Sequence, residues 1–156
     1  MKIFALSDPH LGFDADKPMD IFGPHWKDHP QRISQAWKEA VGKDDLVLVP
    51  GDISWAMRLA EAARDVAFLG DLPGTKVIIK GNHDYWWTGL SKLQTFLPAS
   101  IVPLQNSAYV RGKVGIAGTR LWIDPDLCLE QSTDQDRKIF DRELGRLQSS
   151  LNALPP

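Results

Sequence analysis

The chain has 156 residues and a formal net charge of −2 at pH 7, with scattered Lys and Arg. This length fits one domain with a real core, and this charge gives no electrostatic basis for binding nucleic acid or a membrane surface. Cys128 is the single cysteine, so an intramolecular disulfide is excluded and a cytoplasmic setting is expected. The first residues turn polar too early for a signal peptide, and no apolar stretch has the length of a membrane span.

Three short apolar runs predict buried strands over residues 2–7, 46–49 and 77–79, because each run ends abruptly in polar residues. The first run is followed by a long irregular segment, 12–30, whose prolines and glycines interrupt helices and central strands. A loop of this length in a compact domain is usually functional or packed on itself.

Helices are predicted between and after these strands. Residues 31–41 have apolar side chains at helical spacing, residues 54–69 follow Ser54 as a candidate N-cap, and residues 88–97 follow Thr88 in the same way. The second helix is expected to bury one face, made of Met57, Ala60, Ala63, Ala67 and Phe68. Alternating strands and helices predict βαβ units and a parallel sheet with right-handed crossovers.

The C-terminal third has a different pattern. Residues 101–104 predict a further strand and residues 109–117 a β-hairpin. Residues 133–151 predict a helix, whose capping box is formed by Ser132 and Gln135.

Polar clusters follow the three predicted parallel strands. They are Asp8-Pro9-His10, Gly51-Asp52 and Gly81-Asn82-His83-Asp84. In an open parallel sheet, ligands bind beyond the carboxyl ends of the strands, so these side chains are expected to converge on one site.

The residue types suit divalent metal ions. Asp8 and His10 are two residues apart, and in extended chain both point the same way and can ligate one ion. A carboxylate with an imidazole suits Mn, Fe or Zn better than Ca. Asp52 can bridge to a second ion, to which Asn82 offers its amide oxygen. Two ions about 3.5–4 Å apart hold the attacking and leaving oxygens of a displacement at phosphorus, with a bridging hydroxide as nucleophile.

The last cluster also offers an acid. His83 is expected to face the phosphate together with Asn82 and to donate a proton to the leaving oxygen. Asp84 is expected to accept a hydrogen bond from the other ring nitrogen of His83 and so to orient the ring.

The remaining histidines, His25 and His29, lie in the long loop after the first strand. Two interpretations stay open for them. In the first, the loop packs through Trp26 and exposes both histidines. In the second, the loop lines the mouth of the site and one histidine approaches the metals.

In order and spacing, the three clusters resemble the first three motifs of the calcineurin-like metallophosphoesterase family. The resemblance covers most of the chain, from Lys2 to at least Arg120. It implies an α/β fold in which two sheets form a sandwich with helices outside, and a dinuclear centre that hydrolyses a phosphate mono- or diester. By the motif match, the implied metal ligands are Asp8, His10, Asp52 and Asn82, with His83 as the acid or phosphate contact and Asp84 as its partner.

The chain departs from the family pattern after His83. The family continues with a Gly-His motif and a Gly-His-x-His motif, whereas this chain has no histidine beyond that point. Residues 1–156 are therefore expected to form a metallophosphoesterase domain without its C-terminal portion, with a parallel βαβαβ first sheet and an incomplete second sheet. A weak second metal site, slow hydrolysis and self-association through an uncovered apolar face are expected.

Two other classes of function remain open. A non-catalytic binding or scaffold module would keep the phosphoesterase fold without a competent metal centre, and the missing histidines favour it. A dinucleotide-binding dehydrogenase fold is the third choice, because no Gly-x-Gly-x-x-Gly follows the first strand.

Overall fold

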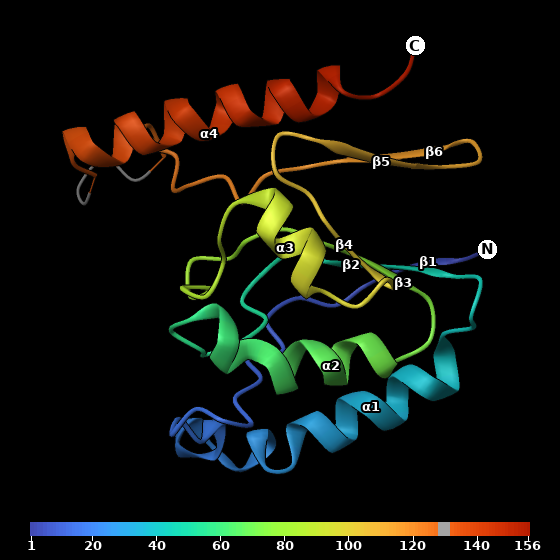
Figure 1. Ribbon diagram of the computed structural model, residues 1–156. Helices are drawn as coiled ribbons and strands as arrows, with labels where there is room; N and C mark the ends of the chain where they lie inside the picture. Colours follow the sequence, from blue (N-terminus) through green and yellow to red (C-terminus); the bar gives the residue numbers. More distant parts are fainter. Residues whose placement is uncertain (128–131) are drawn as a thin grey trace. The chain divides into compact units, whose positions relative to one another are not determined.

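The computed structural model describes residues 1–127 and 132–156, so Cys128 lies outside the described part of the chain. The chain divides into two compact units, Met1–Pro103 and Leu104–Pro156 (Figure 1). In the described ranges, no helix combines the length and apolar character that crossing a bilayer requires.

The first unit is built on a parallel sheet, as the sequence predicts, and the strand predicted at 101–104 joins it as a fourth parallel strand. Its strands are β1 (Ile3–Ala5), β2 (Leu46–Val49), β3 (Thr75–Ile78) and β4 (Ile101–Pro103). They pair in the order β1-β2-β3-β4, with β1 and β4 at the edges. The central strand β2 is a continuous apolar run and β3 ends in Val77 and Ile78, which is typical of a sheet whose faces are covered.

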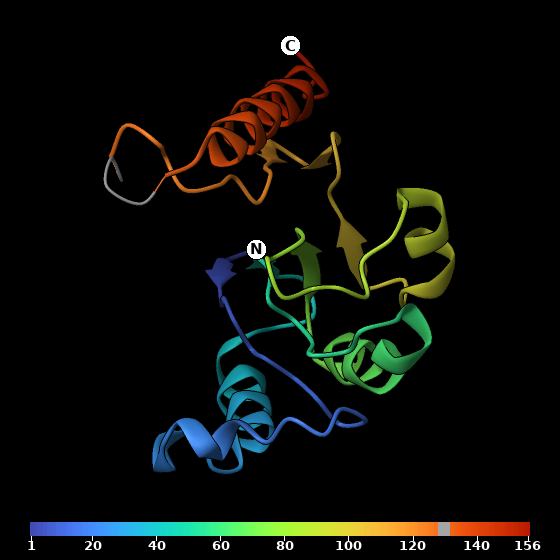
Figure 2. The same cartoon turned by 90° about the vertical axis from the view of Figure 1, so that its left-hand side faces the viewer.

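Helices α1 (His29–Ala40) and α2 (Ala63–Asp71) lie side by side on one face of this sheet (Figures 1 and 2). Helix α3 (Leu90–Phe96) leads into β4. Shorter 3-10 helices are η1 (Met19–Phe22), η2 (Pro24–Trp26) and η3 (Leu59–Ala62). The core between helices and sheet includes the buried residues Trp37, Val49, Val66, Leu69, Ile78 and Leu93.

The predicted helix over 54–69 is wrong in its start and in its buried face. Regular α-helix begins only at Ala63, after η3, and Ser54 does not cap it. The buried side chains of these two helices are those of Ala62, Asp65, Val66 and Leu69, whereas Met57 is 55% exposed. Starting the helix at Ser54 sets the wrong phase for its apolar face. Likewise Thr88 caps nothing, because α3 begins after Gly89 without a side-chain cap.

The second unit contains a small antiparallel sheet and one long helix. The predicted hairpin is confirmed as β5 (Ala108–Arg111) paired with β6 (Val114–Ala117). Helix α4 (Asp134–Asn152) follows, but its capping box uses Thr133 and Asp136 instead of Ser132 and Gln135. The hydroxyl of Thr133 accepts the N–H of Asp136 at 3.2 Å, and the carboxylate of Asp136 accepts the N–H of Thr133 at 2.9 Å.

A buried lysine in β3 gives a test of this fold. The Lys76 side chain has no solvent exposure, and its Nζ donates to the carbonyl oxygens of Leu72, Gly74 and Gly70 at 2.6, 2.9 and 3.2 Å. Burial lowers the pKa of Lys76 to about 8. An unfolded lysine has a pKa of about 10.4, so the unfolded chain binds more protons between these values and stability must rise with pH there.

We expect the free energy of unfolding to rise between about pH 8 and 10.4, by up to roughly 3 kcal/mol more than in a Lys76→Met variant. Urea unfolding of both proteins at several pH values in that range measures the difference, and other titrating groups cancel in the comparison. Parallel pH profiles for the two proteins would contradict a lowered pKa.

Candidate metal centre

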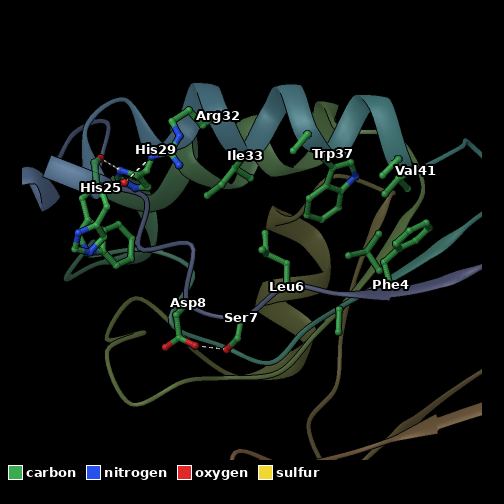
Figure 3. A pocket seen from close by; sticks show the side chains of 15 residues that line it. Phe4, Leu6, Ser7, Asp8, His25, His29, Arg32, Ile33, Trp37 and Val41 are labelled. Carbon is green, nitrogen blue, oxygen red and sulfur yellow. Dashed lines mark hydrogen bonds between the residues drawn. The ribbon is translucent and has the colours of Figure 1, made fainter. Parts of the chain in front are cut away.

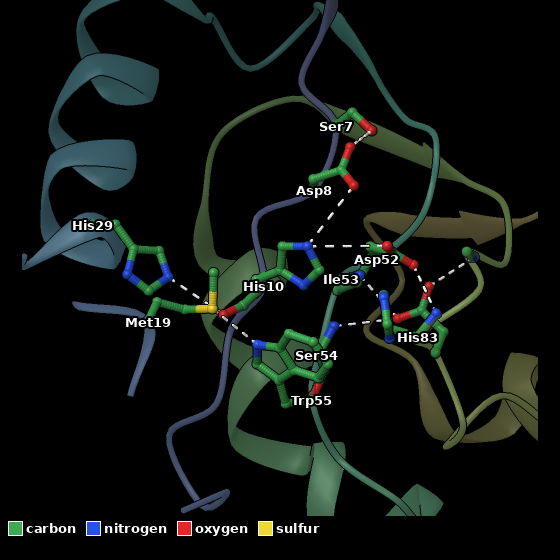
Figure 4. A network of polar contacts seen from close by, with 12 residues as sticks. Ser7, Asp8, His10, Met19, His29, Asp52, Ile53, Ser54, Trp55 and His83 are labelled. Atoms are coloured by element: carbon green, nitrogen blue, oxygen red, sulfur yellow. Dashed lines mark hydrogen bonds and ion pairs between the residues drawn. The ribbon is translucent and has the colours of Figure 1, made fainter. Parts of the chain in front are cut away.

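The predicted site residues lie on three loops at the carboxyl edge of the parallel sheet (Figure 4). Asp8 and His10 follow β1, Asp52 follows β2, and His83 follows β3. All belong to the first unit. The order of the strands therefore places the loops next to one another, as expected for a parallel sheet.

The first two loops are joined by main-chain hydrogen bonds. The N–H groups of Asp8 and His10 donate to the carbonyl oxygens of Gly51 and Asp52 at 3.3 and 3.0 Å. The ladder continues at Leu11, whose N–H donates to the carbonyl oxygen of Ile53 at 2.8 Å. These bonds extend the pairing of β1 and β2 into the site and hold the loops in register.

The three candidate ligands share a strained backbone. Asp8, His10 and Asp52 have positive φ values of 56°, 43° and 50°, which are uncommon for residues other than glycine, although Asp and His adopt them more often than most. The expectation that Asp8 and His10 lie in extended chain is therefore wrong. Each left-handed residue costs on the order of 1–2 kcal/mol, and strain of this kind gathers at functional sites where the surrounding structure enforces it.

Two glycines allow the second and third loops to touch. A Cβ on Gly51, whose φ is 102°, would lie 2.5 Å from the Cα of Gly81. A Cβ on Gly81 would lie 2.1 Å from Oδ1 of Asp52. The glycine before Asp52 and the one before Asn82 are needed for this close backbone approach.

The geometry brings Asp8, His10 and Asp52 together. One ligand atom from each lies within 4.8 Å of the others. Nε2 of His10 is 3.8 Å from Oδ1 of Asp8 and 3.9 Å from Oδ2 of Asp52. These distances are too long for hydrogen bonds. Two atoms that ligate one ion at about 2.1 Å lie at most about 4.2 Å apart, and both carboxylate distances to Nε2 of His10 are below this limit.

The environment of His10 favours a neutral imidazole, which is the form that binds metal. Burial lowers the pKa of His10, and the charges of Asp52 and Asp8 only partly oppose it. Its Nδ1 is buried and has no hydrogen-bond partner among the described residues. The ring stacks on Trp55 with 4.8 Å between centroids and an interplanar angle of 18°. The indole therefore holds the ring in place.

Asp84 has a different place from the predicted one. Its side chain is fully buried beneath the loops. Its oxygens accept four hydrogen bonds of 2.8, 3.2, 2.8 and 2.9 Å, from the N–H groups of Ile53, Ser54 and Gly81 and from the indole of Trp86. These donors occupy the carboxylate that was expected to orient the His83 ring. Burial raises the pKa of Asp84, and the hydrogen bonds oppose that rise.

His83 lies at the edge of the cluster. The main-chain N–H of His83 donates to Oδ1 of Asp52 at 2.9 Å. Its ring is 5.8 Å from the ring of His10 and 4.8 Å from that of Trp55. Aromatic neighbours, instead of Asp84, therefore surround the ring. Asn82 is exposed at the start of the same loop.

The long loop after β1 packs against the site. Nε2 of His29 lies 3.3 Å from the carbonyl oxygen of His10, and its Nδ1 lies 3.1 Å from that of Trp26. Trp26 is 6.2 Å from the His10 ring, edge to face. His25 is exposed. The first interpretation holds in part, because the loop packs through Trp26 and exposes His25 while His29 is half-buried. The approach of a histidine to the metals stays a prediction, since the ring of His29 contacts main-chain carbonyls.

Sequence reasoning missed Asp65, which ties the loops together from α2. The side chain is buried, and its Oδ1 accepts the N–H of Phe13 at 2.9 Å while its other oxygen accepts the hydroxyl of Ser54. Burial raises the pKa of Asp65, with Ser54 opposing. A signal was present: Ala62, Asp65 and Leu69 have the spacing of one helical face, so an acidic residue stands in an apolar stripe.

Comparison with known proteins assigns the chain to a family. A family model described as calcineurin-like phosphoesterase matches residues 1–143. The chain belongs to this family. The fold expected from the sequence resemblance is confirmed in its parallel first sheet and helices, with a second sheet that is small.

Individual relatives cover less of the chain. It is 33% identical over 78 residues to the Gene 66 protein of Mycobacterium phage L5, which is 50% of this chain and 37% of that protein. It is 36% identical over 83 residues to the Gene 66 protein of Mycobacterium phage D29, and this match covers 53% of this chain and 40% of that protein. The matched part is thus about two fifths of the length of these curated relatives. A protein of unknown function from Aquifex aeolicus aligns over 91% of this chain and 73% of its own, with a TM-score of 0.48 and 18% identity.

Proposed function

We propose that this chain is a metal-dependent phosphoester hydrolase, a phosphatase or phosphodiesterase. The observation that carries the proposal is the cluster of Asp8, His10 and Asp52, whose ligand atoms lie within 4.8 Å of one another in a chain of this family. Neutral imidazole and two carboxylates are the donors that divalent transition metals accept.

The proposed centre holds two divalent ions, of Mn, Fe or Zn. Asp8, His10 and Asp52 would hold the first, and Asp52 with Asn82 would hold the second. The second site is the weaker, because it has only two protein ligands in this chain. When bound, such ions supply Lewis-acid activation of water and of the phosphoryl group.

The residues around the ligands have separate tasks in this proposal. Asn82, exposed at the mouth, binds a phosphate oxygen through its amide. His83 donates a ring proton to the leaving oxygen, and its main chain is held by Asp52. Asp84 and Asp65 position the loops from beneath and do not touch substrate.

Replacement of His83 tests this assignment. We expect His83→Ala to reduce kcat for phenyl phosphate at least 100-fold, since general acids contribute factors of about 10² to 10⁴. The loss for p-nitrophenyl phosphate should be much smaller, because its leaving group needs no proton. Lys43→Ala is the control, since Lys43 is exposed and outside the metal cluster.

Metal titration separates this function from the alternative. Within the described residues, one His, Cys, Asp or Glu cluster has metal-ligand spacing, and it offers three protein ligands. This small donor set favours a non-catalytic binding module as the second candidate. Metal binding by calorimetry without any Mn-dependent release of phenol or phosphate would support the module. If His83→Ala reduced kcat equally for phenyl phosphate and p-nitrophenyl phosphate, the role of His83 as general acid would be contradicted, while the proposed metal-dependent hydrolysis would stand.

Self-association and a cytoplasmic location stay predictions. Exposed apolar side chains such as Ile21 and Phe22, at 72% and 61% exposure, are consistent with an associating surface.

A further inference from the structure

A groove of about 530 Å³ lies between β1 and α1 in the first unit (Figure 3). Most of its wall is apolar and includes Phe4, Leu6, Ile33, Ala36, Trp37 and Val41. Pockets of about 300–1,000 Å³ with apolar walls and a few polar groups are typical of small-molecule sites.

The sequence leaves this groove open in two ways. Strand β1 is at the edge of the sheet, so Phe4 and Leu6 are only half-buried. Helix α1 faces them with small side chains, since Ala36 and Ala40 line the groove between larger residues. A larger residue at either alanine would fill the space.

One end of the groove reaches the candidate metal centre. Asp8 lines that end together with His25, His29 and Arg32 (Figure 3). Nη1 of Arg32 donates to the carbonyl oxygen of His25 at 2.6 Å, which holds the guanidinium beside this end. A cation here suits an anionic phosphoester. Of the metal cluster, Asp8 is the residue that lines the groove, so a small molecule seated here lies beside one candidate ligand as well as against the apolar wall.

We propose that the groove binds the apolar group of the substrate, so that the substrate class is an alkyl or acyl phosphoester. This inference rests on the proposed function. The phosphate lies at Asp8, His10 and Asp52, and the chain runs along β1 toward Phe4. Four residues of strand span roughly 13 Å, the length of a medium alkyl chain. An extended peptide or a second copy of the protein could also cover a strand edge, but neither explains why the groove opens at a metal ligand.

Hydrolysis-resistant n-alkyl phosphonates test the inference without relying on turnover. Methyl, butyl and octyl phosphonate are titrated into the full chain by calorimetry, once with Mn²⁺ and once with EDTA. Each buried methylene strengthens binding by a factor of about 3–4, so we expect octyl phosphonate to bind at least about 30-fold tighter than butyl. This increment should persist in EDTA, because the groove and not the metal produces it.

Two variants locate the effect. Ala36→Phe and Ala40→Phe place a ring in the groove from exposed positions on α1, and each should reduce the octyl-to-butyl ratio to below about 5-fold. Gln35→Phe is the matched control, because Gln35 is on the same helix and does not line the groove. Thermal unfolding and light scattering accompany each titration.

The outcomes are distinguishable. Equal affinity of the wild type for butyl and octyl phosphonate overturns the inference and leaves hydrolysis of aryl esters untouched. If octyl phosphonate still binds more tightly than butyl phosphonate in EDTA but the protein shows no Mn-dependent hydrolysis, the proposed function is overturned and the binding of alkyl groups in the groove stands. If Ala36→Phe instead converts a dimer to a monomer and leaves alkyl binding unchanged, the groove is a self-association surface and the inference is wrong.

Discussion

Replacing Asp84 with alanine is expected to lower the free energy of unfolding by about 4 kcal/mol and to abolish metal binding. The carboxylate is fully buried and accepts four hydrogen bonds, three of them from main-chain N–H groups of the second and third site loops. Alanine leaves these donors buried without partners. The loops that hold Asp52 and His83 would then lose the group that joins them.

Asp84→Asn separates the charge from the contacts. An amide keeps one acceptor oxygen, but its nitrogen would face a main-chain donor, either that of Gly81 or those of Ile53 and Ser54. About half of the loss in stability is expected, roughly 2 kcal/mol. Urea unfolding of both variants measures these losses, with the exposed Asp16→Ala as control. If Asp84→Ala is as stable as the wild type and loses only activity, the carboxylate acts on His83, as the sequence motif suggests.

The sequence predicts the parts of the site that depend on neighbouring residues. Each apolar run ends in a polar cluster, and such runs identify strands with little help from the rest of the chain. Parallel pairing then follows from the alternation of strands and helices, and the carboxyl ends of parallel strands must meet. The approximate positions of Asp8, Asp52 and His83 therefore follow from local patterns alone.

Other features depend on contacts between residues distant in sequence. The left-handed backbone at Asp8, His10 and Asp52 is enforced by pairing between two loops, and neither loop shows it alone. The role of Asp84 depends on donors some 30 positions earlier, at Ile53 and Ser54.

Helix α2 shows how a local rule can mislead. Ser54 has a good capping side chain, but its hydroxyl donates to Asp65 instead. That single choice shifts the phase of the predicted helix. Asp65 is then assigned to the solvent face, although it is buried and ties two loops that bear candidate ligands. A polar side chain with a distant buried partner escapes any pattern that assigns acidic residues to the surface.

Replacing Asp52 with asparagine is expected to lower the affinity for Mn²⁺ at least 100-fold, or about 2.7 kcal/mol. Asp52 would contribute a carboxylate to both proposed ions; its Oδ2 faces His10 and its Oδ1 accepts the main-chain N–H of His83. Asparagine is nearly isosteric and keeps that hydrogen bond through its amide oxygen, so the loop is retained while the charge is lost. Asp8→Asn is the matched comparison. Asp8 is 55% exposed and would serve only the first ion, so a smaller loss of about 10-fold is expected.

Stability without metal should change in the opposite direction. The carboxylates of Asp8 and Asp52 both face His10, and without a cation these two like charges share one cluster with only partial screening by solvent. We therefore expect Asp52→Asn to leave the metal-free protein as stable as the wild type or more stable, by up to about 1 kcal/mol. Urea unfolding in EDTA and calorimetry with Mn²⁺ measure the two effects separately. A variant that loses stability and metal affinity together would show that Asp52 mainly supports the loop. Opposite signs would show that the strained cluster is kept for the ion, because a purely structural role gives no reason to hold two carboxylates beside one buried imidazole.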